Sequence, residues 1–182
     1  MNILPPSLEI ALALLTIVAA LYDLKFRRIP NWLVLLGICA GFALNVYQFG
    51  LAGLGRAGLG FIVAFAVYFP LFALRAMGGG DVKLMAAVGS VAGVADWFII
   101  FVITAITGGI IAIGLLLVRG GLRTAVLNVL GIFGALVRLR APYRERPELD
   151  VAHSKAVTLP HGLSIAIGTL LFIVLSVALP AS

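Results

Sequence analysis

The sequence predicts an all-α protein, a polytopic bundle of about six transmembrane helices. Of its 182 residues, 63% are hydrophobic and 11% are charged, and the mean hydropathy is +1.19. Long apolar runs alternate with short charged segments, a pattern typical of multi-pass helical membrane proteins. The net charge of +6 is carried by basic residues that lie between the runs, where they orient a membrane protein. We therefore expect the lipid bilayer as a partner and no nucleic acid.

Six apolar runs approach the length of about 20 residues that a helix needs to cross a bilayer. The first run lacks the basic start and the small-residue cleavage site of a signal peptide, so we interpret it as a retained helix. The fourth is short and rich in small residues, which predicts a central position where neighbouring helices approach closely. Asp96, just before the fifth run, is a candidate N-cap. The runs are residues 4–22, 32–49, 57–74, 82–95, 97–118 and 159–179.

The basic residues predict the orientation of the bundle. Every lysine and arginine except Arg56 lies in or beside the segments that follow the first, third and fifth runs. By the positive-inside rule these segments are cytoplasmic, which requires an even number of spans and places both termini outside. The longest polar segment, residues 119–158, contains an apolar stretch at 125–137, where we expect an interfacial helix.

Two aspartates at the ends of runs are candidates for chemistry. Asp23 follows the first run, and Asp81 follows three glycines at the start of the fourth. The predicted topology places both at the cytoplasmic face. Two neighbouring carboxylates tend to share one proton, so the ionised one can activate a water while the protonated one donates to a scissile carbonyl. This predicts a pair suited to peptide hydrolysis; a helix cap or a solvated loop charge is the alternative for each.

Three segments resemble known motifs in the same order along the chain. Residues 23–31, Asp-Leu-Lys-Phe-Arg-Arg-Ile-Pro-Asn, and residues 78–84, Gly-Gly-Gly-Asp-Val-Lys-Leu, resemble the two catalytic segments of the type IV prepilin peptidases. These enzymes are Gly-x-Gly-Asp membrane aspartyl proteases. Residues 160–162, Pro-His-Gly, are similar to the Pro-x-Gly segment that opens the last span of that family. The resemblance covers nearly the whole chain, as a single peptidase domain over residues 1–182.

The resemblance implies a function and a set of site residues. Asp23 and Asp81 would be the catalytic pair, with no metal and no organic cofactor. The substrates would be pilin-like precursors, in which a basic leader precedes an apolar helix, cut at the cytoplasmic face of the bacterial inner membrane. Gly78, Gly79 and Gly80 would form an active-site loop that tolerates strained φ angles beside an extended substrate. The other motif positions are Lys25, Arg28, Pro30, Asn31, Lys83, Pro160 and Gly162.

Two departures from the family pattern refine this expectation. The only cysteine, Cys39, excludes an internal disulfide and a thiolate zinc site. The cysteine-pair insertion that the family links to pilin methylation is therefore not expected, and the chain is more similar to the compact peptidases of tight-adherence (Flp) pilus systems. His161 stands where we would expect a tyrosine; we interpret it and His153 as isolated, solvated or helix-end residues.

Two other classes of function are weighed against the peptidase. A small transporter or proton-coupled channel would use Asp23 and Asp81 as relay groups, but it needs acids within the spans and a path to the outside. An assembly factor without catalysis would keep its function when either aspartate became asparagine. A homo-oligomer is compatible with all three.

Overall fold

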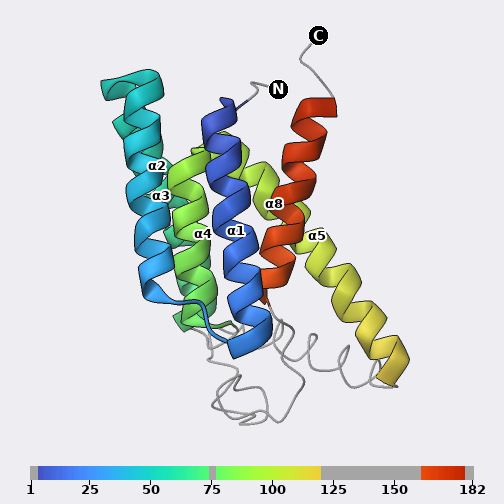
Figure 1. Ribbon diagram of the computed structural model, residues 1–182. Coiled ribbons are helices and arrows are strands. Elements are labelled where there is room, and N and C mark those ends of the chain that lie inside the picture. Colours follow the sequence, from blue (N-terminus) through green and yellow to red (C-terminus); the bar gives the residue numbers. More distant parts are fainter. Residues whose placement is uncertain (1–3, 74–76, 120–160, 179–182) are drawn as a thin grey trace, which may run out of the picture.

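The computed structural model is a bundle of helices without strands over the residues that it describes, 4–73, 77–119 and 161–178 (Figure 1). This confirms the all-α class. The predicted interfacial helix, His153 and Pro160 lie outside the described residues. The helices are α1 (Pro6–Phe26), α2 (Asn31–Phe49), α3 (Leu51–Ala73), α4 (Gly79–Ala92), α5 (Val94–Arg119) and α8 (His161–Ala178).

Five of these helices are long and apolar enough to cross a membrane: α1, α2, α3, α8 and residues 94–115 of α5. The chain is thus a multi-pass membrane protein. The sixth, α4, has 14 residues, which at 1.5 Å per residue gives about 21 Å, against about 30 Å for the hydrocarbon core. The expectation of about six spans therefore becomes five candidate spans and one short helix.

The short helix α4 lies at the centre of the bundle, as its small residues predicted. From Val82 to Ala92 every residue except Lys83 is buried. The helix packs mainly against α2 and α3, and it also contacts α1, α5 and α8. A helix this short is shielded from lipid by its neighbours on nearly every side.

Glycines set the distance between α4 and its neighbours. A Cβ atom added to Gly60 of α3 would collide with the carbonyl oxygen of Gly89, and one added to Gly89 would lie 2.7 Å from the Cβ of Ala64. On the other side, a Cβ at Gly41 of α2 would collide with the hydroxyl of Ser90. These contacts bring backbones together where membrane helices gain most of their packing energy.

The C-terminal end of α4 lies inside the bundle, so the last carbonyl groups of this helix need hydrogen-bond partners from other helices. The amide of Asn45 on α2 donates to the carbonyls of Ser90 (3.0 Å) and Val91 (3.1 Å). The guanidinium of Arg56 on α3 donates to the carbonyl of Ala92 (2.7 Å). Two polar side chains from neighbouring helices thus complete the end of the buried helix.

Two expectations about this end of the bundle were wrong. Helix α3 begins at Leu51, well before residue 57, because Gly50 with φ +59° reverses the chain at once after α2. Arg56 therefore lies in α3. Asp96 is not an N-cap: α5 begins at Val94, and the Asp96 carboxylate forms an ion pair with Arg56 at 2.9 Å.

The start of α1 and the end of α8 lie at the same end of the bundle, together with the C-terminal end of α4 (Figure 1). The end of α1, the start of α4 and the start of α8 meet at the opposite end. The two aspartates, together with His161 and Gly162, belong to this second end.

The Gly60–Gly89 contact predicts a strong local response to a single methyl group. Gly60→Ala should lower the free energy of unfolding by about 1–3 kcal/mol, because the added carbon forces α3 away from the backbone of α4. Gly55→Ala on the same helix meets no atom within 4 Å and should be neutral or slightly stabilising. Thermal unfolding of the detergent-solubilised protein measures both; equal midpoints would contradict the close contact.

Candidate active site

Three helix ends form the site, and two of them carry the aspartates. Asp23 lies in the last full turn of α1 and is buried, with 8% of its surface exposed. Asp81 is the third residue of α4 and is partly buried. The start of α8 completes the group. Residues that are 58 positions apart in the sequence therefore reach one end of the bundle.

The first turn of α8 holds the Asp23 carboxylate. The backbone N–H of Gly162 donates to its Oδ2 atom at 2.9 Å. The first N–H groups of a helix have no partner within the helix, and they carry the positive end of its dipole, so they favour an ionised carboxylate. A Cβ at position 162 would lie 2.9 Å from the same oxygen. Glycine is needed here because it leaves room for this bond.

Asp81 is bound within its own helix start. Gly78 is the N-cap residue of α4, and its backbone N–H hydrogen-bonds the Asp81 carboxylate, as an acid at the third helical position does in a capping box. Helix α4 is outside the five candidate spans, and Asp81 lies at its polar end. Burial raises the pKa of Asp81 to about 6; the charge of His161 lowers this pKa, the Asp23 carboxylate raises it, and the Gly78 bond lowers it.

Both carboxylates border the same cavity, which has a volume of 330 Å³. Its wall combines the two acids with basic and amide side chains and with the glycine segment. The lining residues are Asp23, Arg27, Arg28, Ile29, Asn31, Gly78, Gly79, Gly80, Asp81 and Lys83. Within the described ranges, no three His, Cys, Asp or Glu side chains are grouped as a metal site requires. The cavity therefore brings acidic residues from two helices together with basic and amide side chains in one polar space.

The backbone around the cavity explains how distant side chains reach it. Arg27 adopts a left-handed conformation with φ +53°, which ends α1 and turns the chain toward α2. Arg28 and Ile29 then border the cavity, and Pro30 is the N-cap residue of α2. Nothing in the sequence indicated a left-handed arginine here.

The structure corrects the expectation of a strained glycine loop. Gly79 and Gly80 belong to the first turn of α4, and Gly78 has an ordinary extended conformation with φ −75°. Among the described glycines, positive φ angles occur only at Gly50 and Gly93. The glycines instead leave space: a Cβ at Gly80 would meet Ile29, and one at Gly79 would meet Phe72 at 3.2 Å.

The other predicted site residues divide into two groups. Asn31 and Lys83 border the cavity and are joined by a hydrogen bond of 3.1 Å from the ammonium to the amide oxygen. Lys25 is exposed, and its ammonium lies 5.2 Å from the centre of the Phe26 ring.

The expectation that His161 is a helix-end residue is confirmed, whereas the expectation that it is isolated was wrong. It begins α8, directly before the Gly162 that binds Asp23, and its charge acts on Asp81. The signal in the sequence was its place within Pro-His-Gly. Because His161 directly precedes Gly162, whose N–H binds Asp23, it lies at the same end of the bundle as both acids.

Comparison with protein families gives one match. The model of the type IV leader peptidase family matches residues 10–113, more than half of the chain, and this range includes both Asp23 and Asp81. Comparison with curated proteins found no match, and neither did comparison with solved structures.

Proposed function

The chain belongs to the type IV leader peptidase family, and from this membership we propose that it is a membrane aspartyl endopeptidase. Its substrates are pilin-like precursors, from which it removes a basic leader that precedes an apolar helix. Helix α2 begins at Asn31, directly after the short turn that follows α1, and this turn contains no cysteine pair. This short connection resembles the compact peptidases and favours the precursors of tight-adherence pili. The catalytic pair is Asp23 and Asp81.

One observation carries this proposal: two carboxylates from different helices border one cavity but have different hydrogen-bond partners. Asp23 accepts a hydrogen bond from the backbone N–H of Gly162 at the start of α8, so we assign to it the role of the base. Asp81 has a pKa raised to about 6 by burial, an environment that favours the protonated form more than in water. Acid and base roles are commonly divided in this way between paired carboxylates.

The mechanism follows from these environments. Ionised Asp23 takes a proton from a water whose oxygen attacks the scissile carbonyl carbon, while protonated Asp81 donates its proton to the carbonyl oxygen. The tetrahedral diol then breaks its C–N bond. The leaving nitrogen takes the proton from Asp23, and a diol hydroxyl returns one to Asp81. Both acids finish in their starting states, and no metal takes part.

The distribution of charge supports a cytoplasmic position for the site. Lys25, Arg27, Arg28 and Lys83 lie at the end of the bundle that carries the aspartates, whereas Arg56 lies at the other end. The positive-inside rule then places the acids at the cytoplasmic face and the start of α1 and the end of α8 outside. In a bacterium this is the inner membrane, where the leader of a membrane-anchored precursor would be exposed.

Removing either carboxyl group should abolish cleavage without affecting the bundle. Asp23→Asn and Asp81→Asn should each lower kcat/KM by about 10²–10⁴-fold, because each loses one acid–base partner. A co-expressed precursor, followed by mobility shift and N-terminal sequencing, measures the loss. Glu9→Gln, the same kind of change at the far end of α1, is the control and should cut at the wild-type rate. Processing by both aspartate variants would refute the proposal and favour the transporter or assembly reading.

The pair should give a bell-shaped dependence of kcat/KM on pH. On the alkaline side activity should fall as the pH rises through about 6, because Asp81 loses the proton that it must donate. On the acid side activity should fall once the pair has taken up a second proton, because no ionised carboxylate is then left to act as the base. His161→Gln should move the alkaline limb to higher pH, because a charge that lowers the pKa of Asp81 is removed. A flat profile from pH 4 to 8 would contradict a shared-proton pair.

Gly162 should be required for activity although it carries no side chain. In Gly162→Ala the new carbon would lie 2.9 Å from Asp23 Oδ2 and displace the carboxylate from the N–H of residue 162. A displacement of about 1 Å can cost on the order of 10²-fold in rate. Gly114→Ala on α5, where a Cβ meets no atom within 4 Å, is the matched control. Equal cleavage by the two variants would show that the backbone bond to Asp23 is dispensable.

A further inference from the structure

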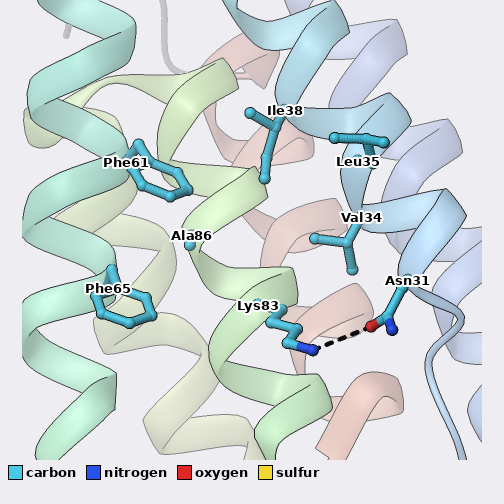
Figure 2. A pocket seen from close by; sticks show the side chains of 8 residues that line it. All are labelled: Asn31, Val34, Leu35, Ile38, Phe61, Phe65, Lys83 and Ala86. Carbon is cyan, nitrogen blue, oxygen red and sulfur yellow. Dashed lines mark hydrogen bonds between the residues drawn. The ribbon is translucent and has the colours of Figure 1, made fainter.

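A groove runs along the bundle between α2 and α3, with α4 as its floor (Figure 2). It has a volume of 340 Å³. Figure 2 shows Phe61 and Phe65 of α3 facing Val34 and Ile38 of α2 across Ala86. We call this feature, which Leu35 also lines, the α2–α3 groove. Its walls are apolar over most of their length.

The α2–α3 groove leads directly to the catalytic cavity. Asn31 and Lys83 line both spaces, and their hydrogen bond lies at the polar end of the groove, beside the catalytic cavity (Figure 2). Away from the cavity, where α2 ends and α3 begins, these two helices approach closely: a Cβ atom at Gly53 would collide with the carbonyl of Asn45. The groove therefore opens toward the aspartates and narrows away from them.

The dimensions of the groove correspond to a short stretch of helix. From Asn31 to Ile38 the wall of α2 extends over seven residues, about 10 Å or two helical turns. Ala86 at the floor is small, so a neighbouring helix can come close to α4. The amide and ammonium at the polar end suit the carbonyl groups of a chain that has left the helical conformation.

From these features we propose that the α2–α3 groove binds the first two turns of the precursor's apolar helix, directly after the scissile bond. This inference rests on the proposed function. The helix lies in the groove, the chain unwinds at Asn31 and Lys83, and the peptide bond to be cut enters the cavity between Asp23 and Asp81. The groove gives the substrate a fixed register relative to the acids.

A second apolar cavity gives the alternative site for the same helix. It has a volume of 440 Å³ and lies between α3, α5 and α8, with Tyr68, Gly108 and Ser164 in its wall. It is larger than the α2–α3 groove and includes His161. However, it shares no lining residue with the catalytic cavity, whereas the α2–α3 groove shares Asn31 and Lys83 with that cavity.

Adjacent leucines on α2 allow a matched test. Leu35 lines the groove and Leu36 does not, although the two are similarly exposed, at 62% and 59%. Leu35→Trp should fill the groove and raise KM for the full-length precursor about tenfold, with kcat unchanged, because it removes binding that the ground and transition states share. Leu36→Trp should leave KM within about twofold of wild type. Both variants should cut a short peptide that spans the cleavage site but lacks the apolar helix at the wild-type rate.

The possible outcomes distinguish a failure of the groove proposal from a failure of the proposed function. If wild type cuts neither substrate, the peptidase proposal fails. If wild type cuts both and Leu35→Trp matches Leu36→Trp on the precursor, the groove does not bind the helix. If Leu35→Trp impairs the short peptide equally, it acts on the acids, and the inference is overturned.

Photo-crosslinking measures occupancy without cleavage. A photoreactive residue at Ile38 should capture the apolar helix of the precursor in the Asp81→Asn protein, and one at Ala105 in the second cavity should not. Capture at Ala105 alone would assign the helix to the second cavity. Capture at Ile38 of lipid only, or of a second copy of this chain, would also overturn the proposal.

Discussion

The fold depends on a helix that is too short for the membrane in which it lies. Helix α4 has 14 residues and ends inside the bundle, where unpaired carbonyls would cost several kcal/mol. Asn45 and Arg56 supply hydrogen bonds to those carbonyls, and glycines on α2 and α3 let the neighbouring backbones surround it. The arrangement of α2 and α3 follows from the need to enclose α4 and cap its end.

The same constraint explains where the acids lie. Helix α4 is short, and its C-terminal end is capped by side chains of α2 and α3. Its N-terminal end lies where α1 ends and α8 begins. The free N–H groups at the starts of α4 and α8 then point at carboxylates, one from Gly78 and one from Gly162. Helix ends thus hold the pair of acids, and each acid accepts a hydrogen bond from a backbone N–H group of its own.

Local patterns in the sequence predicted some features of the structure and missed others. Apolar runs and small residues predicted the helices and the central place of α4, and the motif segments predicted which residues would meet at the cavity. The ion pair of Arg56 with Asp96 and the proximity of His161 to Asp81 were missed because each joins residues from different helices. The start of α3 was missed because one glycine, Gly50, makes the whole turn. These missed contacts depend on how neighbouring helices pack, which apolar runs and single turn residues do not specify.

In the proposed mechanism, helix α4 also connects substrate binding with catalysis. Asp81 lies in the catalytic cavity, Lys83 lines both spaces, and Ala86 forms the floor of the α2–α3 groove. From Asp81 to Ala86, five positions along the helix, the backbone of α4 rises by about 7.5 Å. If the groove holds the apolar helix of the substrate, this distance fixes how far beyond the membrane helix the chain is cut. The position of cleavage would then be determined by the geometry of α4, with little need for the acids to recognise the residues beside the bond.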